Sequence, residues 1–88
     1  MTLLMLSAGC ESGPPVQEMS DARQAISIAR EAGAATAAGE DLSQAEALLE
    51  SAEKNLAGRA YSQARRDAMQ AKEKALNALA TVEPPEQN

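Results

Sequence analysis

Small apolar residues recur every three or four positions along most of this chain, and this spacing is the strongest constraint on its fold. The spacing matches one face of an α-helix, which turns once in 3.6 residues. Alanine fills many of these positions and makes up 20 of the 88 residues. Because an alanine side chain adds only one methyl group to a core, helices that bury alanines must approach each other closely. The sequence therefore predicts one small all-α domain of modest stability.

The apolar stripes predict three helices, over about residues 16–36, 41–57 and 60–81. The first stripe consists of Met19, Ala22, Ile26, Ala29 and Gly33. The second stripe consists of Leu42, Ala45, Leu49, Ala52 and Leu56. The third stripe is the longest and consists of Tyr61, Ala64, Ala68, Ala71, Ala75, Ala78 and Val82. Two prolines then end the helical pattern, because proline lacks the amide hydrogen that a helix interior needs.

Glycines mark the predicted helix ends and one predicted close contact. Gly33 stands inside the first stripe, where we expect it to let a neighbouring helix come close. Gly39 is suited to a left-handed cap after the first helix, and Gly58 closes the second. The second helix is predicted to open at Asp41, with Gln44 as the partner in a capping box.

The helices over 41–57 and 60–81 are joined by so short a turn that they must lie antiparallel. Large side chains of one stripe then face small side chains of the other, in the pairs Leu42–Ala75, Leu49–Ala68 and Leu56–Tyr61. Charged residues of opposite sign flank the two stripes, and this register predicts the interhelical ion pairs Glu46–Lys72, Glu53–Arg65 and Asp41–Lys74. Exposed ion pairs contribute about 0–1 kcal/mol each, so these would set orientation more than stability.

The helix over 16–36 is expected to cover the alanine-rich groove that this hairpin leaves. The predicted architecture is therefore an antiparallel three-helix unit. The alternative is one long rod in an oligomeric coiled coil. The glycines of this region, Gly33, Gly39 and Gly58, argue against the rod, because two of them stand where the stripes are interrupted.

The first ten residues are similar to the end of a bacterial lipoprotein signal peptide. A short apolar run leads through small residues to Cys10, the sole cysteine. The stretch Leu6-Ser7-Ala8-Gly9-Cys10 resembles a lipobox, in which the cysteine is acylated and becomes the mature N-terminus. Ser7 stands where leucine is usual, and no Lys or Arg precedes the run. Either the true start lies upstream of Met1, or the resemblance is accidental.

The chain divides accordingly into four parts. Residues 1–10 are a truncated signal peptide and lipobox, and residues 11–15 (Glu-Ser-Gly-Pro-Pro) are a linker that its prolines stiffen. Residues 16–82 are the alanine-rich helical domain. Residues 83–88 are a polar tail that we expect to be disordered.

Composition excludes several classes of function. The chain has no histidine, so the usual catalytic triads, Cys–His pairs and imidazole metal sites are excluded. A net charge of −5 argues against nucleic-acid binding, which needs a basic surface. We therefore expect no catalytic residue, no metal, no cofactor and no small-molecule substrate. The acidic group Glu46, Glu50 and Glu53 fits a solvated face, or partners for Arg65 and Lys72, better than a metal site.

Two further features have a favoured and a less favoured interpretation. The basic residues Arg65, Arg66, Lys72 and Lys74 form a candidate contact for phosphate or anionic lipid. A solvated face is the favoured interpretation, because no aromatic residues are interleaved with them. Tyr61, the sole aromatic, is expected to plug the end of the hairpin rather than to stack on a ligand.

From Ala22 onward, the order of alanine, leucine and glycine resembles a family of short alanine-rich domains of unknown function in bacterial envelope lipoproteins. The resemblance covers about residues 16–82, and the matching residues include Ile26, Gly33, Leu42, Leu49, Gly58, Tyr61 and Ala68. Relatives often carry proline where this chain has Gly39. In that family the domain occurs alone or ahead of a peptidoglycan-binding domain of the OmpA type. The stretch over 58–68 also resembles half of a tetratricopeptide repeat, which implies a helical hairpin.

Two functions are consistent with these features. The first is a lipid-anchored structural or adaptor protein of the bacterial cell envelope, which binds another envelope protein or a second copy of itself. Acyl chains on Cys10 would hold it in the membrane. In enteric lipoproteins, aspartate directly after the cysteine signals retention in the inner membrane. This chain has Glu11 at that position, which favours the outer membrane, with the domain facing the periplasm. The alternative is a soluble cytoplasmic helical adaptor with no lipid anchor.

Overall fold

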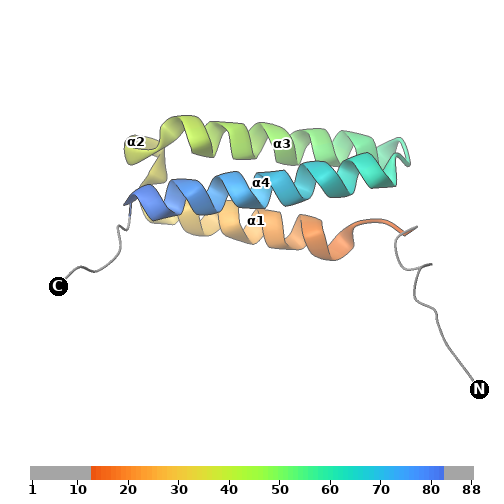
Figure 1. Cartoon of the computed structure of the whole chain (residues 1–88), viewed down its shortest axis with the longest axis horizontal. Helices are drawn as coiled ribbons and strands as arrows, with labels where there is room; N and C mark the ends of the chain where they lie inside the picture. The colour runs from red at the N-terminus through yellow and green to blue at the C-terminus, as the bar shows by residue number, and fades with distance from the viewer. Residues whose placement is uncertain (1–12, 83–88) are drawn as a thin grey trace, which may run out of the picture.

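A computed structural model describes residues 13–82 and arranges them as four helices (Figure 1). The helices are α1 (Val16–Glu31), the single turn α2 (Ala34–Ala37), α3 (Gly39–Ala57) and α4 (Tyr61–Val82). Within this range the fold is all-α, as predicted. The predicted signal peptide and lipobox, the first two linker residues and the tail over 83–88 lie outside the described residues.

The three long helices lie side by side, with α4 between α1 and α3 in this view and α3 antiparallel to both (Figure 1). Helix α1 packs against α3 and also against α4, so it covers the groove of the α3–α4 hairpin. This arrangement confirms the three-helix unit within the described residues. The linker residue Pro15 is fully buried, so the fold begins before the first helical residue.

The core is built mainly from alanine. Ten of its alanines have no exposed surface, namely Ala22, Ala29, Ala34, Ala45, Ala52, Ala64, Ala68, Ala71, Ala75 and Ala78. Larger side chains are few. Met19 is buried near the start of α1, Ile26 in its middle, and Leu42 near the start of α3. With such small side chains, the buried area per helix depends on close approach of the backbones.

The predicted register between α3 and α4 agrees with the structure. Leu42 shares one apolar cluster with Ala75, and Leu49 and Leu56 pack against the cluster that contains Ala68. A hydrogen bond from Ser51 of α3 to Asp67 of α4 also crosses the hairpin, and it gives the same register to within one residue.

The connection between α1 and α3 differs from the prediction in each detail. The first helix ends at Glu31 rather than near residue 36, because Gly33 adopts a left-handed conformation with φ +96°. A Cβ atom added at Gly33 would have no atom within 4 Å, so close approach of a neighbouring helix is not the reason for this glycine. Its backbone conformation is the reason, since residues with a Cβ rarely adopt it. The turn α2 then follows.

The start of α3 also differs. The helix begins at Gly39, two residues before the predicted start at Asp41. Gly39 is therefore a helical residue, and the left-handed cap predicted for it is wrong. The predicted capping box is absent from this terminus, because no side chain caps it. Gln44 instead donates to a carboxylate oxygen of Glu40, at 3.4 Å.

The turn between α3 and α4 places a charged residue in an unfavourable conformation. Gly58 has φ −87°, a value open to any residue, whereas the next residue, Arg59, has φ +63°. Arg59 is the one non-glycine residue with positive φ in the described part of the chain. A left-handed conformation costs an ordinary residue about 1–2 kcal/mol.

Exchanging two glycines for alanine tests this account of the α1–α3 connection. Gly33→Ala should lower the free energy of unfolding by about 1–2 kcal/mol, because alanine resists positive φ. Gly39→Ala is the matched control, since it lies at a helical position with open space around it. It should raise the free energy of unfolding by about 0.4–1 kcal/mol. Urea unfolding followed by circular dichroism measures both, and equal effects would contradict the account.

Candidate functional site

The predicted lipidation residue, Cys10, and the lipobox residues before it (Leu6, Ser7, Ala8 and Gly9) lie outside the described residues. The nearest described residue is Gly13, whose carbonyl oxygen accepts a hydrogen bond from Arg65 Nη2 at 2.9 Å. Arg65 Nε also lies 3.4 Å from Glu18 Oε2. The side chain of Arg65 is only 18% exposed, so α4 holds the start of the described chain firmly.

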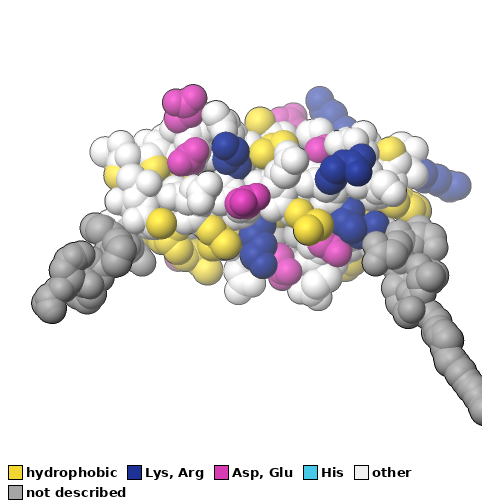
Figure 2. All heavy atoms as spheres, viewed as in Figure 1, with side chains coloured by type: hydrophobic (Ala, Val, Ile, Leu, Met, Phe, Trp, Pro, Cys, Tyr) yellow, Lys and Arg dark blue, Asp and Glu magenta, His cyan; other side chains and the backbone are white. Residues whose placement is uncertain are grey.

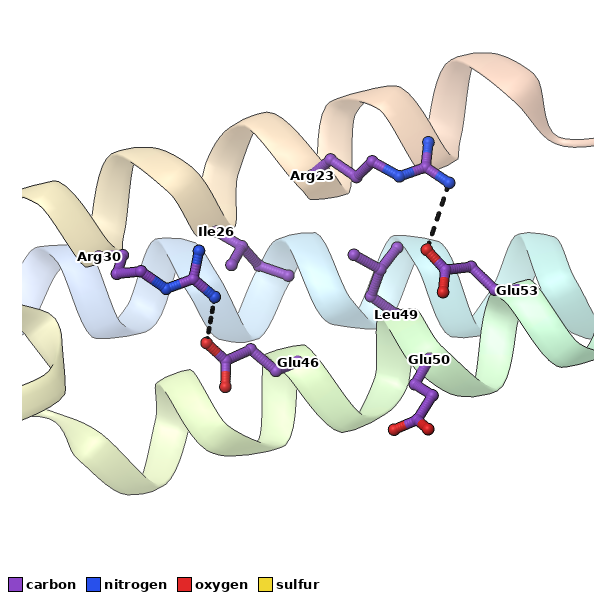
Figure 3. A pocket seen from close by; sticks show the side chains of 7 residues that line it. All are labelled: Arg23, Ile26, Arg30, Glu46, Leu49, Glu50 and Glu53. Carbon is purple, nitrogen blue, oxygen red and sulfur yellow. Dashed lines mark hydrogen bonds and ion pairs between the residues drawn. The ribbon is translucent and has the colours of Figure 1, made fainter.

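Two ion pairs join α1 to α3 across an open groove (Figure 3). Arg23 Nη2 lies 3.4 Å from Glu53 Oε2, and Arg30 forms the equivalent pair with Glu46. The two arginines are seven residues apart, as are the two glutamates, so the antiparallel helices repeat the same contact two turns on. Ile26 and Leu49 lie between the two pairs (Figure 3).

These contacts correct the predicted charge pairs of the hairpin. Glu46 pairs with Arg30 rather than with Lys72, and Glu53 pairs with Arg23 rather than with Arg65. The third predicted pair, Asp41 with Lys74, is also absent from the ion pairs of residues 13–82.

The prediction placed these glutamates beside α4, whereas this flank of α3 faces α1. Lys72 lies on the opposite side of α4, in the groove between α4 and α1. The third glutamate, Glu50, points away from α1 (Figure 3). Within residues 13–82 no group of acidic residues and cysteine is arranged to hold a metal ion. Because two arginine–glutamate pairs cross the α1–α3 groove and join the two helices, we interpret this groove as a structural seam.

A buried carboxylate joins α3 to α4. Asp67 is 7% exposed, and its Oδ2 accepts hydrogen bonds from Ser51 Oγ at 2.7 Å and Asn55 Nδ2 at 2.9 Å. Its Oδ1 accepts a third bond from Gln63 Nε2, at 2.9 Å. These donors come from both helices, so they fix the hairpin in rotation as well as in register.

The pKa of Asp67 reflects two opposing effects. Burial alone would raise the pKa of this carboxyl group, because it disfavours the charged form. The hydrogen bonds from Ser51, Gln63 and Asn55, together with the charge of Arg66, outweigh burial and lower the pKa below its ordinary value of 3.8. Asp67 is therefore a charged structural residue with all its partners in place, rather than a free acid or base.

A third feature is an exposed apolar groove between α1 and α4. Its apolar lining consists of Met69 and Leu76 of α4 and Ile28 of α1, which are 56%, 46% and 46% exposed. Hydrophobic side chains are visible along this seam in Figure 2. Lys72 and the carboxylates of Asp21 and Glu73 also line it. Single exposed apolar residues are ordinary, whereas three that line adjoining hollows provide a surface for apolar side chains of a partner.

Among the described helices, none is both long enough and apolar enough to cross a membrane.

A double-mutant cycle tests the corrected ion pairs. Arg30→Glu and Glu46→Arg should each lower the free energy of unfolding, and the combined swap should recover about 0.3–1 kcal/mol, because the pair is largely solvent-exposed. The recovery should shrink in high salt. The matched control combines Glu46→Arg with Lys72→Glu, for which we expect no coupling. If urea unfolding showed that Glu46 couples to Lys72 and not to Arg30, the pairing predicted from sequence would be correct and the pairing seen in the structure would be wrong.

The pH dependence of unfolding tests Asp67. Because its pKa is lowered in the folded state, Asp67 contributes stability that is fully present above about pH 4 and is lost as the pH falls through the lowered pKa. Asp67→Asn should cost about 1–3 kcal/mol at pH 7, since an amide cannot accept all three hydrogen bonds. The difference from the wild type should shrink in acid. Glu73→Gln, at an exposed position of the same helix, should change neither quantity.

Comparisons with known proteins bear on the described domain as a whole. Those with curated proteins and with solved structures found no match. The model of one protein family, a domain of unknown function designated DUF4398, matches residues 17–84, which include all four helices except the first residue of α1, Val16. Because this match extends over most of the 88-residue chain, the protein belongs to the DUF4398 family.

Proposed function

We propose that the protein is a lipid-anchored structural or adaptor protein of the bacterial cell envelope, which acts by protein–protein interaction. The observation that carries the adaptor role is the exposed apolar groove lined by Ile28, Met69 and Leu76. Because these side chains are already about half-buried, covering the remainder of each contributes about 0.7–1.5 kcal/mol, so a partner that covers all three gains appreciable affinity.

Two sequence features support the anchor. The stretch from Leu6 to Cys10 resembles a lipobox, and the sequence over about residues 16–82 resembles alanine-rich domains of bacterial envelope lipoproteins. Glu11 after the cysteine favours the outer membrane, with the domain facing the periplasm. Relatives that precede OmpA-type domains suggest that the partner is another envelope protein, and a second copy of this chain is the other candidate.

Acylation is tested by expressing the gene with its own upstream sequence in a bacterial host. After detergent phase separation, we expect the wild type in the detergent phase, with acyl mass on Cys10. The Cys10→Ser variant should lack that mass. A wild-type product that stays in the aqueous phase with an unmodified cysteine would refute the anchor and favour the soluble cytoplasmic adaptor.

The groove is tested with a photocrosslinking amino acid introduced at four positions of α4 in cells. Positions 69 and 76 line the groove, and positions 70 and 77, one residue further on, are exposed but do not line it. Crosslinks to a discrete envelope protein, or to a second copy, should form at 69 and 76 and be at least severalfold weaker at 70 and 77. Equal yields at all four positions would argue against the groove.

A further inference from the structure

The charges of this chain are segregated along the sequence. Residues 54–66 contain four basic residues and no acidic one, although the whole chain has eight basic residues and a net charge of −5. The preceding stretch, residues 31–53, contains six acidic residues and no basic one. The basic stretch spans the end of α3, the turn, and the first residues of α4.

The fold turns this segregation into a charge asymmetry between two ends of the bundle. The α3–α4 turn lies at the end where α1 begins (Figure 1). We name this end the basic pole and define it by Lys54, Arg59, Arg65 and Arg66. Figure 2 shows Lys and Arg side chains gathered there. The opposite end holds the α1–α3 connection, with the acidic residues Glu31, Glu40 and Asp41 around it.

Most cations of the basic pole are not neutralised within the bundle. Lys54, Arg59 and Arg66 are exposed, and none of them pairs with a carboxylate of residues 13–82. Arg66 donates a hydrogen bond to an uncharged partner, Gln63 Oε1, at 3.0 Å, and its charge helps to lower the pKa of Asp67 although the two groups form no ion pair. The arginines of α1 differ, since both pair with glutamates of α3. The basic pole therefore presents at least three cations to its surroundings.

Two further observations at this pole point to a ligand. Arg59 occupies the tip of the turn with φ +63°, so a charged residue stands where glycine would be more stable. Tyr61, the sole aromatic of the chain, is the first residue of α4 and is half-buried beside the turn. Tyrosine and basic residues together are typical of surfaces that meet lipid headgroups.

We propose that the basic pole binds the anionic phospholipid headgroups of the membrane that carries the anchor. This inference rests on the proposed lipid anchor. Two residues stand between Cys10 and Gly13, so Gly13, whose carbonyl oxygen accepts a hydrogen bond from Arg65 of the pole, lies at most about 11 Å from the acylated residue. That distance is close to the Debye length of about 8–10 Å, so the cations experience the surface potential. The acidic end then points away from the membrane, and the α1–α4 groove stays open along the side.

The test uses the full chain with Cys10→Ser, so that no acyl group contributes. Co-sedimentation is measured with vesicles of phosphatidylcholine alone and of phosphatidylcholine with phosphatidylglycerol. We expect binding only to the vesicles that contain phosphatidylglycerol, and weaker binding as salt is added. Tyr61 provides a second signal, because its fluorescence should be quenched when brominated phosphatidylglycerol replaces the ordinary lipid.

Matched variants separate the basic pole from net charge. Arg59→Gln with Arg66→Gln, and Lys72→Gln with Lys74→Gln, each remove two positive charges. The first pair should weaken binding about 30-fold, at about fivefold for each cation near the surface, and the second should leave it within about twofold. Arg59→Gly should weaken binding about fivefold while raising the urea midpoint, which excludes loss of folding as the cause.

Two outcomes would overturn the proposal. One is equal binding of the wild type to both kinds of vesicle. The other is an equal loss in the two double variants, which would show that net charge, not the pole, governs binding. Because the tested chain is not acylated, neither outcome bears on the anchor itself. An acylated protein whose basic pole does not bind phosphatidylglycerol would leave the proposed function intact and refute only this inference.

Discussion

This structure depends on the close approach of three helices, which their alanine side chains make possible. Within residues 13–82 one leucine, Leu42, is fully part of the buried core, and the chain has no phenylalanine, so the bundle gains burial only if its backbones come near each other. Such packing does little to select one rotation or one register of a helix against its neighbour, because a helix surface made of alanines has few projecting side chains. Polar contacts supply that selection. The Asp67 network sets α4 on α3, the two arginine–glutamate pairs set α1 on α3, and Arg65 with Glu18 sets α1 on α4.

The hairpin of α3 and α4 could be predicted from sequence because the two features that determine it, the apolar stripes and the short turn, can both be read from neighbouring residues. Leucines recur on one stripe and alanines on the other, and a short turn permits only antiparallel packing. The charge pairs could not be predicted in the same way. Glu46 and Glu53 were matched to the nearest basic residues of the hairpin, whereas the third helix determines which flank of α3 is covered. Asp67 was missed because an acidic residue beside a stripe is usually a solvated one.

The α1–α3 connection was mispredicted for a conformational reason. The stretch around Ala34 and Ala35 continues a helical composition, so nothing in its residue types stops the first helix. The left-handed backbone of Gly33 stops it, and a glycine inside an apolar stripe has two interpretations that sequence cannot separate. The structure separates them, because no neighbouring atom lies where a side chain would be. Arg59 is the converse case, because it adopts a left-handed conformation that its residue type does not favour, next to a glycine that does not adopt one.

The bundle has three long helices, an odd number, and this decides where the described chain enters and leaves it. The described chain enters at one end of the bundle, at Gly13, and after three passes leaves at the other, at Val82. A hairpin or a four-helix bundle would return it to its starting end. The last helix has 22 residues, so entry and exit are separated by about 33 Å of helix. A domain or partner attached beyond Val82 would therefore be kept about one bundle length away from whatever binds the N-terminus, so the bundle would act as a spacer.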